Sequence, residues 1–197
     1  SAVHDIPQTV YLCREDEVPN GIGADDIVLH SHEECLRNKK AQAENFRHIE
    51  EESNKMHAQR LLQAVDNKYA VVNPPYPPMT SEELDRSFDL PYTRLPHPKY
   101  KGKRIPAYEM IKFSVNLHRG CFGGCAFCTI SAHQGKFIAC RSKRSIVEEV
   151  KKVIEMPDFK GYLSDLGGPS ANMYGMHGNN PKACAVCKRP SCIHPQV

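Results

Sequence analysis

Short apolar runs near the start of the chain predict β-strands. Residues 8–13 and 26–31 are rich in β-branched and aromatic side chains, and a turn-forming sequence at residues 19–21 separates them. Residues 69–72 form a third apolar run, which ends at consecutive prolines that favour an extended backbone. We therefore expect three short strands in this part of the chain.

A helical pattern lies between the second and the third of these strands. Residues 33–65 contain neither glycine nor proline, and apolar side chains recur there at spacings of three and seven, on one helix face. We predict a long helix for which Ser31 or Ser53 could be the cap, so that the helix would break near Ser53-Asn54. The acidic run at residues 48–52 is expected to be a solvated face rather than a catalytic site.

The middle of the chain combines one helix signal with a proline-rich segment. Thr80 or Ser81, followed by two glutamates, predicts a helix start, and this helix should end before Pro91. Residues 91–106 contain four prolines together with tyrosines and a histidine. We expect this irregular segment to be an arm packed on the rest of the protein, because an idle linker rarely carries so many aromatic residues.

The second half of the chain has the pattern of a βαβ unit. Residues 111–115 and 161–165 are predicted strands, and between them Ser145 and Glu148 have the spacing of a helix-capping box. Apolar residues then recur along one helix face at Ile146, Val147, Val150, Val153 and Ile154. The handedness rule predicts a right-handed parallel crossover, whose first loop leaves the carboxyl end of a strand, where α/β barrels place their chemistry.

Composition and charge limit the class of protein. The chain of 197 residues has 40% hydrophobic residues and a net charge of +3, which suits one domain or parts of two. So small a charge gives no strong attraction to nucleic acid or to an anionic membrane. No apolar run approaches the roughly 20 residues needed to cross a bilayer. Nine cysteines without a secretory signal favour a reducing compartment, so we expect a cytoplasmic, metal-binding protein without membrane partners.

The strongest chemical signal is the cysteine loop, residues 119–128, with the sequence Arg-Gly-Cys-Phe-Gly-Gly-Cys-Ala-Phe-Cys. Its thiols belong to Cys121, Cys125 and Cys128, and its three glycines allow the backbone to wrap tightly, including at positive φ. Three thiolates can ligate one metal centre. A set of three leaves one iron of a [4Fe–4S] cluster open to another ligand, since such clusters normally take four cysteines.

Other metal assignments stay open. The same thiols could hold zinc together with His118 or His133, or they could be ordinary thiols. A second cysteine-rich segment near the C-terminus contains Cys184, Cys187, Cys192 and His194. Structural zinc, an auxiliary iron–sulfur cluster and free thiols are all alternatives for it. We expect packing or surface positions, not ligand positions, for Cys13, Cys140 and His177.

A glycine pair follows the last predicted strand. Gly167 and Gly168 would allow a ligand to approach the backbone closely, because neither carries a Cβ atom. A plain turn is the alternative interpretation. The cysteine loop one strand earlier favours ligand binding, because context is what supports a short motif.

Longer motifs resemble one protein family. The cysteine spacing, with Phe127 before the last cysteine, is similar to the signature of the radical S-adenosylmethionine (SAM) superfamily. Within that superfamily the chain resembles the bacterial YgiQ family in Asn-Pro-Pro (73–75), Arg-Ile-Pro-Ala-Tyr-Glu-Met (104–110), Ser-Val-Asn (114–116) and Ser-Asp-Leu-Gly-Gly-Pro-Ser-Ala-Asn-Met-Tyr (164–174). The resemblance runs from about residue 69 to the end, and more weakly through the helix before it.

The resemblance implies a cofactor and roles for particular residues. A [4Fe–4S] cluster would be held by Cys121, Cys125 and Cys128, and its open iron would chelate SAM. Phe127 would pack beside the adenine, and Gly167 and Gly168 would bind the SAM amino group through their carbonyls, although Pro169 stands where an acidic residue is often found. An external electron donor would reduce the cluster, and SAM would be cleaved to methionine and a 5′-deoxyadenosyl radical that attacks an unknown substrate.

Members of this family are much longer, so the resemblance also implies a fragment. The expected fold class is α/β. Residues 1–105 would be the end of an α/β N-terminal domain with the proline-rich arm, and residues 106–197 the opening βα units of a partial radical SAM barrel with a cysteine-rich tail. An open half-barrel would expose strand edges through which two copies could dimerise. We expect the fragment alone to be inactive.

Two other functions compete with a radical SAM enzyme. A zinc-binding structural or nucleic-acid-binding module would need histidines or tail cysteines to complete its sites. The nearest approach to a basic patch for such a module consists of Arg141, Lys143, Arg144, Lys151 and Lys152. A passive electron carrier would normally fill all four cysteine positions of its cluster. We favour the radical SAM interpretation over these two, because it needs only three cysteines and an external chelator.

Overall fold

The computed structural model describes residues 4–193, and the chain divides into two compact units. Unit 1 contains the chain up to Pro77 together with the segment from Gly178 onward, and unit 2 contains Pro78–His177. Each unit combines helices and strands around a hydrophobic core of its own, which confirms the α/β class. The predicted domain boundary at residue 105 concerns the domains of longer proteins and stays a prediction.

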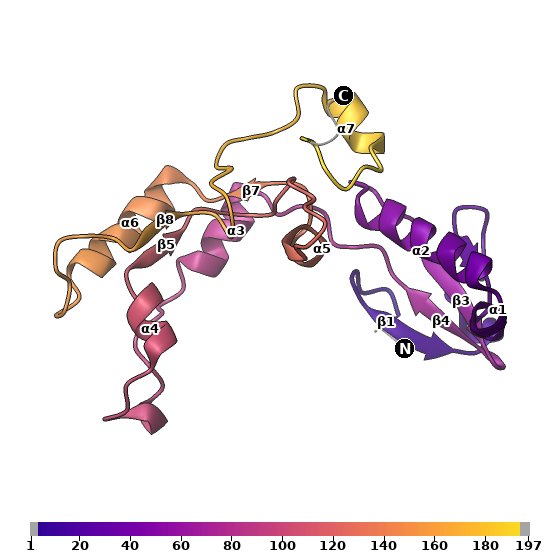
Figure 1. The fold of residues 1–197 in the computed structure, drawn as a ribbon, viewed down its shortest axis with the longest axis horizontal. Helices are drawn as coiled ribbons and strands as arrows, with labels where there is room; N and C mark the ends of the chain where they lie inside the picture. Colours follow the sequence, from indigo (N-terminus) through magenta and orange to yellow (C-terminus); the bar gives the residue numbers. More distant parts are fainter. Residues whose placement is uncertain (1–3, 194–197) are drawn as a thin grey trace. The chain divides into compact units, whose positions relative to one another are not determined.

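A four-stranded sheet forms the centre of unit 1 (Figure 1). Its strands are β1 (Val10–Cys13), β2 (Ile27–Leu29), β3 (Leu61–Val65) and β4 (Lys68–Val72), in the order β1-β4-β3-β2. The pairs β1–β4 and β3–β4 are antiparallel, whereas β2 and β3 run parallel. The three predicted strands of this region are confirmed as β1, β2 and β4.

Two successive helices stand where one long helix was predicted. Unit 1 contains α1 (His32–Arg37), α2 (Lys39–Ser53), α7 (Pro181–Val186) and the short 3-10 helix η1 (Glu15–Glu17). Ser31 caps α1 by accepting the Glu34 amide, as predicted, and α2 ends at the predicted break. Asn38 separates the two helices, because its side chain accepts the Lys40 amide and so begins a new helix.

The helix prediction fails for residues 54–65. This segment ends in β3, where Leu61 is 5% exposed and Leu62 is fully buried. Both leucines bury their side chains in the sheet of unit 1, and that burial outweighs the small intrinsic preference of leucine for helices. Amphipathic periodicity does not distinguish such a buried strand from one more turn of helix.

Unit 1 has a small hydrophobic core and an arginine that fastens a turn to its sheet. Its buried residues are Cys13, Val18, Leu62 and Val71. Burial raises the pKa of the Cys13 thiol, and its predicted packing role is confirmed. Arg60 donates to both carboxylate oxygens of Asp26 (2.8 and 2.7 Å) and to the carbonyls of Pro19 and Gly21. This guanidinium thereby fixes the predicted turn at residues 19–21 against the sheet.

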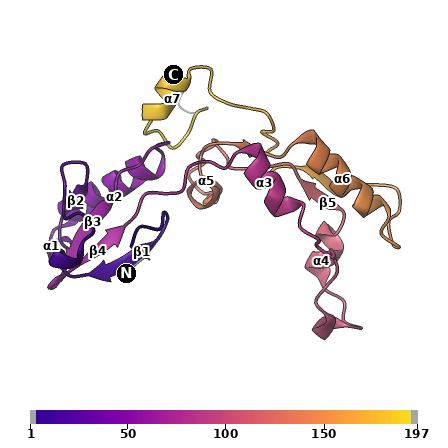
Figure 2. The ribbon, with the colours of Figure 1, turned by 180° about the vertical axis from the view of Figure 1, so that it is seen from behind.

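Unit 2 is built on a short parallel strand pair and a hairpin, and Figure 2 labels its helices and one strand of the pair. Strands β5 (Ser114–Asn116) and β8 (Asp165–Gly167) run parallel, and β6 (His118–Arg119) pairs antiparallel with β7 (Ala139–Cys140). The helices are α3 (Ser81–Phe88), α4 (Pro106–Ile111), α5 (Ile130–Gln134) and α6 (Lys143–Ile154), with the 3-10 helix η2 (Pro98–Tyr100). The predicted parallel arrangement of the two strands is confirmed, but both strands lie further along the chain than predicted: Ile111 ends α4, residues 161–164 are not a strand, and β8 includes Gly167 of the glycine pair.

Helix α6 packs on β5 to form the second core. Val153 of α6 and Val115 of β5 are 0% and 1% exposed, and burial of a side chain of this size contributes about 1.5–3 kcal/mol. The other buried residues of this core are Phe113 and Leu117. Val147 and Ile154 are about half exposed, so the apolar stripe of α6 is narrower than predicted.

The start of α6 corrects the predicted capping box. Ser142, not Ser145, caps the helix by accepting the Ser145 amide (3.2 Å). Ser145 lies inside the first turn, fully buried, and its hydroxyl donates to Asp89 Oδ1 (2.6 Å). Its hydroxyl therefore makes a tertiary hydrogen bond to the residue that follows α3. A local sequence motif cannot reveal such a bond.

The proline-rich segment is mostly exposed, so the prediction of a packed arm is wrong for most of its length. Tyr92, Leu95 and Tyr100 are 62%, 64% and 40% exposed. The exception is Arg94, whose side chain is only 19% exposed and bonds to β5 and α6. Helix α4 begins at Pro106, a residue that the sequence assigned to the irregular segment, because proline is well tolerated in the first turn of a helix.

Candidate functional site

The cysteine loop lies between the two strands of the β6–β7 hairpin. It follows β6, and the chain then passes through α5 and returns to β7. The amide of Cys121 donates to the Gly135 carbonyl (3.1 Å) and ties the two ends of this excursion together. The hairpin escaped sequence prediction because two-residue strands carry no detectable period.

Two glycines of the loop are required by its backbone. Gly120 has a φ of +90°, and a Cβ atom there would lie 2.1 Å from the Phe137 carbonyl oxygen. Gly124 has a φ of +57°. Tight wrapping at positive φ is confirmed at both positions, and a side chain at position 120 would push the loop away from the chain that enters β7.

The thiols of Cys121 and Cys125 lie beside the same glycine. A Cβ atom on Gly123 would be 3.4 Å from Cys121 Sγ and 3.6 Å from Cys125 Sγ. The missing side chain of Gly123 therefore keeps the space next to both sulfurs clear. Cys121 is buried and Cys125 is exposed, while Cys128 is half-buried and lies one turn further on, with its amide donating to the Cys125 carbonyl (2.9 Å).

The three thiols do not form a closed ligand set in this conformation. Within residues 4–193, no three side chains of His, Cys, Asp or Glu are close enough together to hold one metal ion. The donor chemistry nevertheless fits an iron–sulfur cluster, since cysteine thiolates on one short loop are the ligands that such clusters use. Cluster binding would require the three thiols to come closer together than they are in this conformation.

The residues expected to contact SAM have contrasting environments. Phe127 is 92% exposed and makes little contact with the chain. Gly167 is buried in β8, and its carbonyl already accepts the Leu117 amide (2.8 Å), which leaves one lone pair for another donor. Gly168 begins the segment that follows. The roles that the resemblance implies for these residues stay predictions.

His118 lies fully buried against Gly168. Its Nε2 accepts the amide of Met173 (2.9 Å). A Cβ atom on Gly168 would lie 2.0 Å from this same Nε2, so that only glycine fits against the imidazole. The other ring nitrogen, Nδ1, is buried and has no hydrogen-bond partner among the described residues. The zinc alternative gains nothing here, because Nε2 is occupied and His133 is exposed on α5.

The segment after β8, residues 168–175, is called the glycine loop below, and three further bonds fasten it to the hairpin. Ser170 Oγ donates to Cys121 Sγ (3.5 Å), which joins the glycine loop to the cysteine loop. The two remaining bonds reach β7 and the residue after it: the Gly175 amide donates to Cys140 Sγ (3.2 Å), and the Tyr174 hydroxyl donates to the carbonyl of Arg141 (2.9 Å).

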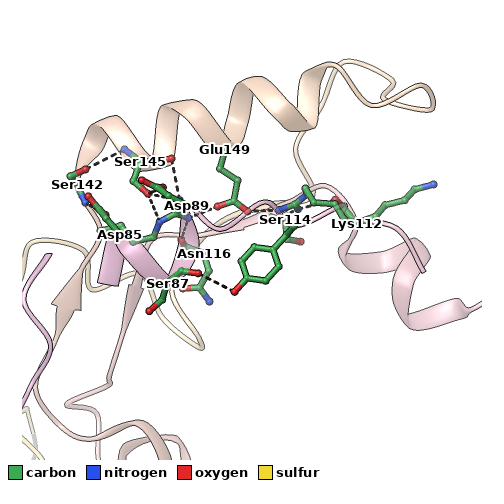
Figure 3. Close-up of polar contacts among 12 residues, drawn as sticks. Asp85, Ser87, Asp89, Lys112, Ser114, Asn116, Ser142, Ser145 and Glu149 are labelled. Carbon is green, nitrogen blue, oxygen red and sulfur yellow. Dashed lines mark hydrogen bonds and ion pairs between the residues drawn. The ribbon is translucent and has the colours of Figure 1, made fainter. Parts of the chain in front are cut away.

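A buried ionic network lines the outer edge of β5 (Figure 3). Glu149 of α6 pairs with both Arg94 and Arg141. The two guanidinium groups also donate, at 2.8–3.0 Å, to three outward carbonyls along the strand, those of Lys112, Ser114 and Asn116. The carbonyl of Phe113, by contrast, accepts an amide from the β8 side. The network thus occupies the edge of β5 that β8 does not use.

Arg141 corrects the predicted basic patch. Its side chain is fully buried, donates to Ser145 Oγ (2.8 Å) and stacks over the Phe88 ring at 4.4 Å. Arg144 pairs with Asp89, and the hydrogen bond from Ser145, followed by that from Arg144, holds the pKa of Asp89 below its usual range. Both arginines link the end of α3 to α6; Arg141 is fully buried and so contributes nothing to a cationic surface, whereas Arg144 is 70% exposed.

The second cysteine-rich segment lies on and after α7. Cys184 and Cys187 are half-buried and Cys192 is exposed. The Cys187 amide donates to the Cys184 carbonyl (3.3 Å), and a Cβ atom on Gly178 would lie 2.2 Å from Cys184 Sγ. His194 lies outside the described residues. The described part of this segment holds no assembled set of three ligands.

Comparison with known proteins identifies the family. A family model described as "Radical SAM N-terminal" matches residues 1–114, more than half of the chain. A "UPF0313 protein" of Bacteroides thetaiotaomicron is 75% identical over 98% of the chain, and one of Porphyromonas gingivalis is 62% identical over the whole chain. The chain belongs to the UPF0313 family. The "UPF0313 protein YgiQ" of Escherichia coli is 45% identical over 87% of the chain, which confirms the resemblance to YgiQ.

The chain is much shorter than its UPF0313 relatives. It spans 31% of the length of the two more similar proteins and 23% of the E. coli protein. The expectation that it corresponds to part of a longer protein is confirmed. No solved structure matches the chain. None of the helices formed by the described residues has the length and apolar character needed to cross a bilayer.

Proposed function

We propose that the chain is the part of a radical SAM enzyme that contains the cluster-binding loop and the first βα units of its barrel. In this proposal Cys121, Cys125 and Cys128 hold a [4Fe–4S] cluster. The observation that carries it is the position of two sulfurs beside the side-chain-free Gly123, in a loop that follows the parallel strand β5 and the two-residue strand β6. Membership of the UPF0313 family, with its radical SAM N-terminal domain, supports the same conclusion.

The chemistry assigned to the cofactors is reductive cleavage of SAM. The bound cluster would supply one electron, obtained from an external donor, to SAM at its open iron, and a 5′-deoxyadenosyl radical would act on a substrate of unknown class. The chain's own residues bind and orient. Phe127 is exposed enough to cover the adenine, and the Gly168 carbonyl and the second lone pair of the Gly167 carbonyl are acceptors for the SAM amino group.

The test is electron paramagnetic resonance after anaerobic reconstitution with iron and sulfide. We expect the dithionite-reduced chain to give a [4Fe–4S]⁺ signal that shifts when SAM is added. Cys125→Ala should abolish the signal, whereas Cys35→Ala, which removes a thiol of unit 1, should leave it unchanged. Tightly bound zinc in place of a cluster would overturn the proposal and favour the zinc-binding alternative.

The cysteines on and after α7 supply a second, separable part of the proposal. Cys184, Cys187 and Cys192 are proposed to hold a second metal, since the turn from Cys184 to Cys187 places two thiols one helical turn apart. The variant in which Cys121, Cys125 and Cys128 are all alanine should still bind about one equivalent of zinc or iron per chain. Loss of all bound metal from that variant would contradict the second site.

A further inference from the structure

The two loops of the proposed site are held together by one buried side chain. His118 ends the path from β5 into the cysteine loop, three residues before Cys121, and Met173 lies in the glycine loop. The bond from the Met173 amide to His118 Nε2 is buried, with His118 0% and Met173 7% exposed. The other bonds of the glycine loop to the hairpin lie at partly buried or exposed positions.

The hydrogen bond fixes the chemical form of the imidazole. A ring nitrogen that accepts an amide hydrogen carries no proton of its own, so that a neutral His118 has its proton on Nδ1. Gly168 confirms how closely the ring and the glycine loop approach, because a Cβ atom would lie 2.0 Å from Nε2 and 2.3 Å from Cε1. The imidazole therefore meets the glycine loop at two points, the Met173 amide and the face of Gly168.

We propose that His118 is a positioning residue for SAM: through Nε2 it sets the glycine loop in register with the cysteine loop. The inference rests on the proposed function, because it assigns the two loops to one ligand. The cysteine loop would hold the cluster that chelates SAM, and the glycine loop would present the carbonyls that bind its amino group. An error in their relative position weakens SAM binding while the three cysteines still hold the cluster.

Three variants test the proposal. His118→Leu removes the acceptor with little change of volume, and His118→Gln keeps an acceptor near the position of Nε2. Gly168→Ala leaves both bonding groups in place but introduces the clash with the ring. His133→Leu, on the exposed face of α5, is the matched control.

The first measurement needs neither cluster nor SAM. In the metal-free chain, the Met173 amide should exchange its hydrogen at least tenfold faster in His118→Leu than in the wild type, corresponding to about 1.4 kcal/mol. His118→Gln should restore most of the protection, and the control should match the wild type. Equal protection in His118→Leu and wild type would overturn the assignment of this bond.

The second measurement is SAM binding by the reconstituted chain, followed by the shift of the cluster signal. We expect His118→Leu and Gly168→Ala to retain iron and the SAM-free spectrum, and to raise the Kd for SAM at least tenfold. His118→Gln should stay within about threefold of the wild type. If the Kd for SAM is unchanged in His118→Leu while SAM shifts the cluster signal of the wild type, the positioning role is wrong but the proposed function stands. If SAM does not shift the cluster signal of the wild-type chain, the proposed function itself is wrong.

Discussion

At the scale of single residues, unit 2 depends on one carboxylate. Glu149 pairs with two arginines at once, and Arg141 is fully buried. A buried charge that loses its partner is costly, whereas a paired one is close to neutral in its net effect. Each guanidinium also has carbonyl acceptors on β5, although Arg94 Nε is buried without a hydrogen-bond partner among the described residues.

Glu149→Gln should destabilise unit 2 by about 3–5 kcal/mol, because it leaves two buried guanidinium groups without a counter-charge. The measurement is the free energy of unfolding in urea. Glu148→Gln, at the neighbouring exposed position that pairs with Lys151, is the control and should leave this free energy unchanged within error. A similar loss in both variants would show that helix propensity, not the buried network, is responsible.

A second residue-scale prediction concerns the pH dependence of unit 1. The hydrogen bonds from Arg60 hold the pKa of Asp26 below its usual range. A depressed pKa in the folded state adds stability above the unfolded pKa of about 3.9, and this stability disappears as the pH falls through the folded pKa.

Asp26→Asn should therefore cost about 1–2 kcal/mol at pH 7, and the difference from the wild type should shrink below about pH 4. Unfolding in urea at a series of pH values measures it. A difference that persists undiminished at pH 2 would mean that shape and neutral hydrogen bonds, rather than charge, account for the effect.

At the scale of elements, local capping signals were reliable only where the cap is also local. Thr80 and Glu83 form a complete capping box, and α3 begins where the sequence predicts it. Ser145 and Glu148 have the same spacing, yet the Ser145 hydroxyl donates to Asp89, a residue 56 positions away in sequence. Capping residues predicted α3, periodicity predicted α6, and short apolar runs predicted β1, β2 and β4 for the same reason, since each signal lies within one window of sequence.

The parts that sequence reasoning missed depend on long-range contacts. β3 is a strand because it pairs with two neighbouring strands, β2 and β4, and the β6–β7 hairpin is too short for any period. His118 was considered only as a zinc ligand, and its bond to Met173, 55 residues away, has no sequence signal. Among the predicted site residues, the structure brings Cys121 and Cys125 beside Gly123, while Cys128 stands apart.

At the scale of the whole molecule, the chain contains two units with separate cores. Asp26 and Glu149 belong to different units and share no hydrogen-bond partner among those described. Free energies of substitutions at such independent sites usually add. We expect the double variant Asp26→Asn, Glu149→Gln to unfold in two steps, each shifted as in the corresponding single variant. One merged transition, shifted by both changes, would contradict the independence of the units.

Dimerisation would depend on which strand edges of the chain are exposed. The sequence predicted exposed strand edges through which two copies could dimerise, and the arginine network occupies one of these edges. If two copies dimerise through a strand edge, we therefore expect them to use β8, where Asp165 and Leu166 are exposed.

The network on β5 has a consequence for biosynthesis. Arg94 precedes β5 in the chain, and Arg141 and Glu149 both precede β8, so every group that covers the outer edge of β5 leaves the ribosome before the strand's partner does. Chains fold as they are made, and unpaired strands are the sites where nascent chains aggregate. Once α6 has formed, β5 has a single open side, and β8 is the next strand to emerge.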